Sequence, residues 1–143
     1  MIRRVAALLA AGALLCACGS VSPGAAMAGW VKQSGFNANA RSLFSDVKSS
    51  AKDLRNDALS SNDLHTFCNV LFVDDGSMQS SLPTPDAQAT SLLNKAYRDF
   101  AAAAVECYSA ISVAGDRAKA LATLSDGAAI FSEARARVAA AES

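Results

Sequence analysis

Apolar residues recur every three or four positions through most of the chain, which is the spacing of one face of an α-helix. The first such segment spans 37–59. Its apolar seam comprises Ala40, Phe44, Val47, Ala51, Leu54 and Ala58. A second segment spans 62–74, with Ser61 placed to cap its N-terminus. Its inward positions are Leu64, Phe67, Cys68 and Leu71. The first half of the chain is therefore predicted to form two helices, the second of them short.

The second half of the chain predicts two further helices. Asp75-Gly76 interrupts the apolar spacing, so 77–83 is expected to be a loop. Thr84-Pro85-Asp86 then begins a helix, because threonine caps well, proline fits the first turn and aspartate stabilises its positive end. The seam of this helix comprises Leu93, Ala96, Phe100, Ala103, Cys107, Ala110 and Ala114. Gly115 ends it, and Asp116 caps a fourth helix. The inward positions of the fourth helix are Leu121, Leu124, Ala128, Phe131 and Val138.

Four amphipathic helices with short connections predict an all-α fold, arranged as an up-and-down four-helix bundle over residues 36–143. The seam residues Ala96, Ala103 and Ala110 are small, which favours close helix packing over an internal cavity. Gly127 lies inside the fourth helix, where glycine costs about 1 kcal/mol relative to alanine. This glycine marks the position at which that helix would kink.

The first residues have the pattern of an export signal. Met1-Ile-Arg-Arg is basic, and the apolar stretch 5–15 is shorter than the roughly 20 residues of a membrane-spanning helix. The segment Leu15-Cys16-Ala17-Cys18 resembles the lipobox of bacterial lipoproteins, although that motif usually has a small residue or a small aliphatic one where Cys16 stands. The resemblance implies that residues 1–17 are removed as a lipoprotein signal peptide and that Cys18 receives acyl chains such as palmitate. Two such chains are enough to anchor a protein on a membrane.

The competing interpretation of the N-terminus is ordinary secretion, because Ala26-Met27-Ala28 has the form of a signal cleavage site. Residues 18–35 are rich in Gly, Ser and Ala with little periodicity, and we expect a flexible tether. Within it, Trp30 either docks on the domain, which is the simpler expectation, or lies at the membrane interface. The lipobox resemblance implies an exported protein, anchored on the outer side of the cytoplasmic membrane or in the outer envelope. The membrane is then a partner through the lipid.

Charge and composition narrow the class of function. The 143 residues include thirteen Lys and Arg against thirteen Asp and Glu. Removal of Arg3 and Arg4 with the signal leaves eleven basic against thirteen acidic side chains. A nucleic-acid partner is not expected, because such proteins normally carry a basic excess.

Cys68 and Cys107 both lie on inward seams, and an exported chain meets oxidising conditions, so we predict an interhelical disulfide. Two buried free thiols are the alternative. Cys68 lies close to the predicted loop, whereas Cys107 lies about 33 Å along the third helix. The pairing therefore predicts that the second helix lies beside the far end of the third and that the loop runs back along it.

The chain offers little catalytic chemistry. His65 is the only histidine, and His65-x-x-Cys68 falls short of the three or four ligands that zinc needs. Asp74-Asp75 is interpreted as a solvated helix end rather than a pair of catalytic carboxylates. The chain has neither a Gly-rich phosphate loop nor a Gly-x-Ser-x-Gly motif. We therefore expect no enzyme activity, no metal and no cofactor.

One charge pattern points to an interaction surface. Four basic residues on the first helix fall within about 60° of one another on a helical wheel, and Asp46, Asp53 and Asp57 form a second stripe. The basic residues are Arg41, Lys48, Lys52 and Arg55. Either each stripe pairs with charges on a neighbouring helix, or the basic stripe faces anionic headgroups or an acidic envelope protein.

The leading hypothesis for function is a non-enzymatic interaction or structural module at the membrane surface. The alternatives are a small-molecule or haem carrier and a factor that blocks an envelope channel. A carrier would need an apolar cavity near Phe67, Phe72, Phe100 or Phe131.

Overall fold

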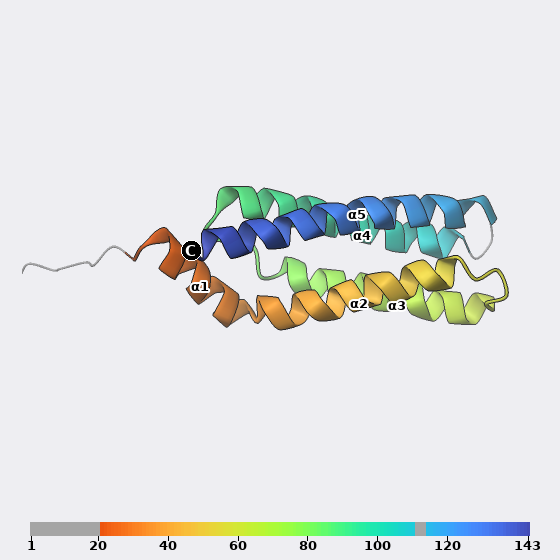
Figure 1. Cartoon of the computed structure of the whole chain (residues 1–143). Coiled ribbons are helices and arrows are strands. Elements are labelled where there is room, and N and C mark those ends of the chain that lie inside the picture. Colours follow the sequence, from red (N-terminus) through yellow and green to blue (C-terminus); the bar gives the residue numbers. More distant parts are fainter. Residues whose placement is uncertain (1–20, 111–113) are drawn as a thin grey trace, which may run out of the picture.

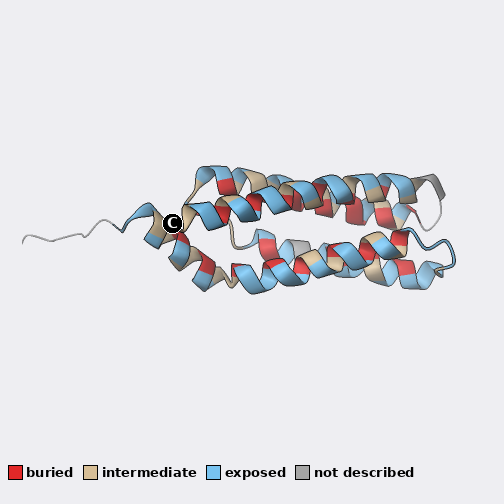
Figure 2. Ribbon diagram, viewed as in Figure 1, coloured by how far each residue is buried: buried red, intermediate tan, exposed pale blue. Residues whose placement is uncertain are grey.

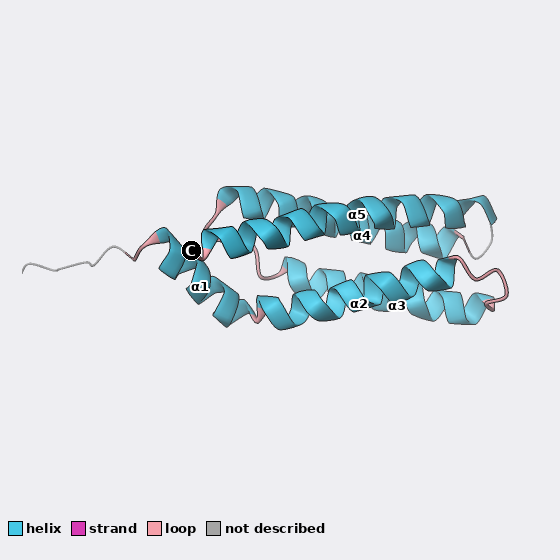
Figure 3. Cartoon of the chain, in the orientation of Figure 1, coloured by secondary structure: helices cyan, strands magenta, loops and turns pink. Residues whose placement is uncertain are grey.

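The computed structural model describes residues 21–110 and 114–143, and this part of the chain is helical apart from its loops (Figure 3). The helices are α1 (Pro23–Ser34), α2 (Phe36–Leu54), α3 (Ser61–Gln79), α4 (Ala87–Ser109) and α5 (Ala114–Ala141). The all-α prediction is confirmed.

The four long helices pack as a ring, and α1 lies across one end of it. Helix α2 contacts α3, α3 contacts α4, α4 contacts α5, and α5 returns to α2. Helices that follow one another in the chain run in opposite directions along the long axis of the molecule (Figure 1). The buried residues lie on the sides of these helices that face one another (Figure 2). Helix α1 contacts both α2 and α5, so it closes the end of the molecule at which the C-terminus also lies (Figure 1).

The tether predicted over 18–35 is wrong from Pro23 onward, because α1 is a capped and packed helix. The Ser22 hydroxyl accepts a hydrogen bond from the Ala25 backbone N–H, and Gly35 ends the helix in a left-handed conformation, at φ 62°. Met27 and Val31 are buried in the common core. The alanines that suggested a flexible segment are strong helix formers, and the few large side chains recur at helical spacing.

Trp30 fixes α1 to the rest of the molecule, as expected for a docked side chain. Its indole N–H donates to the carbonyl oxygen of Ser81 at 2.8 Å, and its ring lies 5.1 Å from that of Phe36. This contact joins α1 to the segment that follows α3.

The second predicted helix is longer than expected. Helix α3 has 19 residues, as many as α2, and it continues through Gly76 to Gln79. Ser60, rather than Ser61, caps it by accepting from the Asp63 N–H. The extension follows from packing, because Met78 lies two helical turns after Leu71 and is buried on the same side. Core burial outweighs the modest cost of glycine in a helix.

The last two helices begin close to their predicted starts. Asp86, not Thr84, caps α4, since its carboxylate accepts from the Ala89 N–H at 2.7 Å. The Thr84 hydroxyl instead accepts from the Asp86 N–H and supports this cap. Helix α5 already begins at Ala114, before the predicted cap Asp116.

Helices α4 and α5 approach closely at Gly127, which is buried. A Cβ atom at this position would lie 2.9 Å from two ring atoms of Phe100. Helix α5 runs on through Gly127 to Ala141, so this glycine provides space for a neighbouring ring within an unbroken helix. Phe131 packs edge-on against the same ring, with 5.8 Å between centroids.

The structure joins Cys68 of α3 to Cys107 of α4 in a disulfide, with their Cα atoms 5.7 Å apart. Cys107 is two residues from the end of α4, so α3 lies beside the far end of α4 as the pairing predicts. The predicted path of the loop is wrong. The chain covers most of the distance from Cys68 as helix α3, and only residues 80–86 connect it to α4.

Candidate interaction surface

The predicted basic stripe lies along one flank of α2. All four members are exposed: Arg41, Lys48, Lys52 and Arg55. The Arg41 and Arg55 guanidinium groups donate to carbonyl oxygens of the preceding turn, each at 3.1 Å, so these side chains lie back on their own helix. The Lys48 ammonium lies 4.7 Å from the centre of the Phe44 ring, which is a cation–π distance.

The stripe takes no part in the ion pairs of the described residues. These pairs are Lys95–Asp99, Arg117–Asp57, Lys119–Glu106 and Arg137–Asp86. The expectation that each stripe meets charges on a neighbouring helix holds for Asp57 of the acidic stripe, which follows the end of α2 and lies 3.6 Å from Arg117. Backbone carbonyls thus hold Arg41 and Arg55, and the Phe44 ring holds Lys48.

A groove of about 240 Å³ runs between α2 and α5 beside this stripe. Its apolar lining comprises Phe44, Val47 and Ala51 from α2 and Leu121, Leu124 and Ala128 from α5. Two members of the basic stripe, Lys48 and Arg55, complete the α2 wall, and Ser125 completes the α5 wall. The lining contains no acidic side chain. The groove thus combines an apolar floor with a cationic edge.

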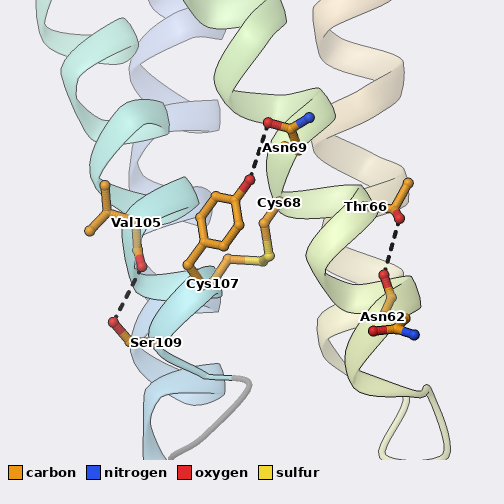
Figure 4. The surroundings of a disulfide bond; sticks show 8 residues. Asn62, Thr66, Cys68, Asn69, Val105, Cys107 and Ser109 are labelled. Carbon is orange, nitrogen blue, oxygen red and sulfur yellow. Dashed lines mark hydrogen bonds between the residues drawn. A yellow bond between two sulfur atoms is a disulfide. The ribbon is translucent and has the colours of Figure 1, made fainter.

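The disulfide forms a second, structural cluster between α3 and α4. Cys68 and Cys107 are buried, and the Tyr108 hydroxyl donates to the side-chain oxygen of Asn69 at 3.1 Å beside them (Figure 4). The exposed His65 ring stands edge-on to Tyr108, with 4.6 Å between ring centroids. His65 is thus part of an aromatic pair. Within the described residues, no three His, Cys, Asp or Glu side chains gather where they could hold a metal ion.

The carboxyl groups of Asp86 and Glu106 have lowered pKa values, and each belongs to an ion pair between helices. The hydrogen bond from Arg137 and that from the Ala89 N–H lower the pKa of Asp86 to about 2, against a small opposing effect of burial. Burial raises the pKa of Glu106, but hydrogen bonds from Thr123 and Lys119 outweigh it and leave that pKa below its ordinary value. Both groups tie α4 to α5 rather than forming a reactive site.

The phenylalanines that would surround a carrier cavity do not gather around one space. Phe72 is exposed on α3 (53%), whereas Phe100 and Phe131 are fully buried against each other. Phe67 is half-buried on α3.

Three predictions from the sequence fall outside what the structure describes. Residues 1–17, Cys18 and the side chains of Asp74 and Asp75 are not among the described residues. No helix in the described part is both long and apolar enough to cross a lipid bilayer.

Comparison of the chain with models of protein families, with curated proteins and with solved structures found no match. The surface on α2 and α5 is therefore interpreted from its own geometry.

Sequence reasoning located the basic stripe but missed the groove. It assigned Phe44, Ala51, Leu121 and Ala128 to the core, and the structure packs all four against the core but leaves them partly exposed at its edge. The signal was present, because the apolar faces of both helices are wider than a single buried seam requires. The spacing alone does not say which edge of each face meets the other helix.

Proposed function

We propose that the chain is a non-enzymatic interaction module of the bacterial cell envelope. Its four long helices form an up-and-down bundle, and the basic face of α2 is its binding surface. One observation carries this proposal: four exposed cations share one flank of α2 and take no part in the ion pairs of the described residues. Such a flank attracts an anionic partner because its charges are not already neutralised within the molecule.

The proposal includes export and anchoring through acyl chains on Cys18, on the outer side of the cytoplasmic membrane or in the outer envelope. Helix α1 begins at Pro23, so an anchored chain keeps the α1 end of the bundle within about 17 Å of the lipid. The basic stripe runs from Arg41 near that end to Arg55 at the other, over about 21 Å. A bundle lying on its side would present the whole stripe to headgroups, and an upright bundle would present it to a neighbouring envelope protein.

The strength of the electrostatic contribution follows from the number of charges. A Lys or Arg near an anionic membrane contributes about 1 kcal/mol, and exposed charges are screened over about 8 Å at physiological ionic strength. Four contacts along α2 are therefore enough for measurable association without the lipid, and this association should weaken as salt is added.

The test is binding of the unlipidated chain to vesicles of anionic or neutral lipid. The first variant carries glutamine at the four positions of the stripe. A matched control carries glutamine at four other exposed basic positions: Lys32, Lys95, Arg98 and Lys119. The control has the same net charge as the stripe variant, so a difference between them reports the location of the charges.

We expect the native chain and the control to bind anionic vesicles in a salt-dependent way, and the stripe variant to bind much more weakly. Equal binding by all three proteins would contradict a role for the stripe. Binding to neither kind of vesicle would refute the membrane as the anionic surface and leave an acidic protein as the remaining partner, to be sought by crosslinking in intact cells.

A further inference from the structure

We infer that the groove between α2 and α5 receives an acidic amphipathic helix from a partner protein. The inference rests on the proposed function and names the partner of its binding surface. Apolar side chains of the partner helix would enter the groove, and its carboxylates would pair with Lys48 and Arg55. This is the helix-in-groove mode of recognition, in which anchors at i, i+3, i+4 and i+7 make the contacts.

The two walls of the groove have the geometry that a third helix requires. Phe44, Val47 and Ala51 follow one another at i, i+3 and i+7 on α2, and Leu121, Leu124 and Ala128 repeat this spacing on α5. Each wall therefore presents an apolar ridge about 10 Å long, or two helical turns. A helix laid along both ridges would place two or three of its own apolar side chains on the floor between them.

The charges around the groove select an acidic partner. Lys48 and Arg55 are seven residues apart, so their backbone positions lie about 10 Å apart along the axis of α2, which is the spacing of carboxylates at positions i and i+7 of an incoming helix. On α5 the surface next to the groove consists of small, uncharged side chains. Its exposed residues include Ala118, Ala122, Ser125, Ala129 and Ser132. A helix can therefore approach α5 closely while its acidic edge lies over α2.

Other occupants fit the groove less well. At about 240 Å³, the open groove lies below the 300–1,000 Å³ of typical small-molecule sites, so it would leave most of such a ligand in water. Residues 1–20 of this chain contain no acidic residue to meet Lys48 and Arg55. A helix of another protein brings both the carboxylates and the surrounding surface that a shallow groove needs.

The experiment measures binding of the full unlipidated chain to three designed helical peptides of about three heptads. All three share one apolar stripe, and the residues beside it are Glu, Gln or Lys. Fluorescence polarisation at about 50 and 300 mM salt gives the affinities, because exposed ion pairs weaken over this range. We expect the Glu peptide to bind at least about tenfold more tightly than the Gln peptide at low salt, and the Lys peptide not to bind.

Two pairs of variants locate the binding site. Lys48→Gln with Arg55→Gln should weaken the Glu peptide about tenfold or more, whereas the charge-matched pair Lys32→Gln with Arg98→Gln should leave it within about twofold. Ser125→Phe places a large ring in the groove and should abolish binding. Ser91→Phe adds the same ring at an exposed site on α4 and should leave binding intact.

Three results would overturn the inference. These are equal affinity for the Glu and Gln peptides, equal losses in the two charge pairs, and no binding of the Glu peptide at about 1 mM. Anionic vesicles, tested with the same variants, separate this inference from the proposed function. Vesicle binding that depends on the stripe, without peptide binding, would contradict the helical partner but would still support the proposed interaction module. Absence of both vesicle binding and peptide binding would contradict the helix partner and also the membrane as the anionic surface. Self-association of the chain that blocks peptide binding would assign the groove to a second copy and would also overturn the inference.

Discussion

Replacing Gly127 with alanine measures how tightly α5 packs on α4. In an ideal helix this change adds about 1 kcal/mol of stability, because glycine has the larger conformational freedom in the unfolded chain. Here the new Cβ would lie 2.9 Å from Cδ1 and Cε1 of Phe100 and 3.1 Å from the Cβ of Asp99. Ordinary carbon contacts are about 3.5–4.0 Å, so one of the groups must move by roughly half an ångström or more.

The Phe100 ring has little freedom to make that space. It is fully buried and stands edge-on to Phe131. Forcing an extra methyl group into such a core costs about 1–3 kcal/mol. The gain in helix propensity offsets part of this cost, so Gly127→Ala should range from neutral to about 2 kcal/mol destabilising.

Two other glycines provide matched controls, since a Cβ atom added at Gly29 of α1 or at Gly76 of α3 would meet no neighbouring atom within 4 Å. Alanine at either site should raise stability by up to about 1 kcal/mol. The difference between Gly127→Ala and these controls is then the packing cost alone, about 1–3 kcal/mol. For a domain of this size it corresponds to a difference in melting temperature of about 4–12 °C.

Thermal unfolding followed by far-UV circular dichroism measures this difference. Adding Phe100→Leu to both backgrounds should reduce the cost of Gly127→Ala, because the two sites are in contact and their effects are not additive. Stabilisation of the native protein by Gly127→Ala to the same extent as by the controls would refute the tight contact between α4 and α5.

Three further predictions concern the anchor, the disulfide and the ion pair at the start of α4. Cys18→Ser should release the protein from membranes or leave an unprocessed precursor; an intact mass that begins at Gly29 without an acyl group would contradict lipidation. Serine in place of Cys68 or Cys107 should lower the melting temperature by about 15 °C, since the bond closes a loop of 39 residues and contributes about 4 kcal/mol; two alkylatable thiols in the unfolded, non-reduced protein would rule the bond out. Asp86 has a pKa lowered from 3.8 to about 2, so its pairing with Arg137 stabilises the fold above about pH 4 and is lost towards pH 2. The melting temperatures of the native protein and Arg137→Gln should therefore differ at neutral pH and converge near pH 2, whereas a constant difference would show that the pair does not act through this titration.

The sequence identified the long helices because their apolar residues repeat at helical spacing. It misjudged segments in which a local signal competed with packing. Gly76 suggested a break in α3, but burial of Met78 carries the helix onward. Small residues suggested a tether, but Met27, Val31 and Trp30 fix α1 to the core and to Ser81.

The sequence predicted the part of the candidate surface that lies on α2 alone, but it did not predict the groove that α2 and α5 form together. The positions of the basic residues on α2 follow from a helical wheel, which needs no knowledge of the neighbouring helices. The groove depends on how α2 and α5 face each other, and this is a contact between segments about seventy residues apart. No spacing within a single segment contains that information.

In the ring of long helices, α2 and α3, α3 and α4, and α4 and α5 follow each other directly in the chain, whereas α2 and α5 pack together without being neighbours in the chain. At one end of the contact between α2 and α5, the Arg117 guanidinium group donates a hydrogen bond to the carbonyl oxygen of Asn56. At the other end, α1 contacts both helices. Separation of α2 from α5 would therefore not stretch a loop between them, and it would not break the disulfide that joins α3 to α4. Amide hydrogens of α2 and α5 along this edge should therefore exchange with solvent faster than those beside the disulfide. A helix that binds in the groove should slow this exchange, because it would contact both α2 and α5 and hold them together.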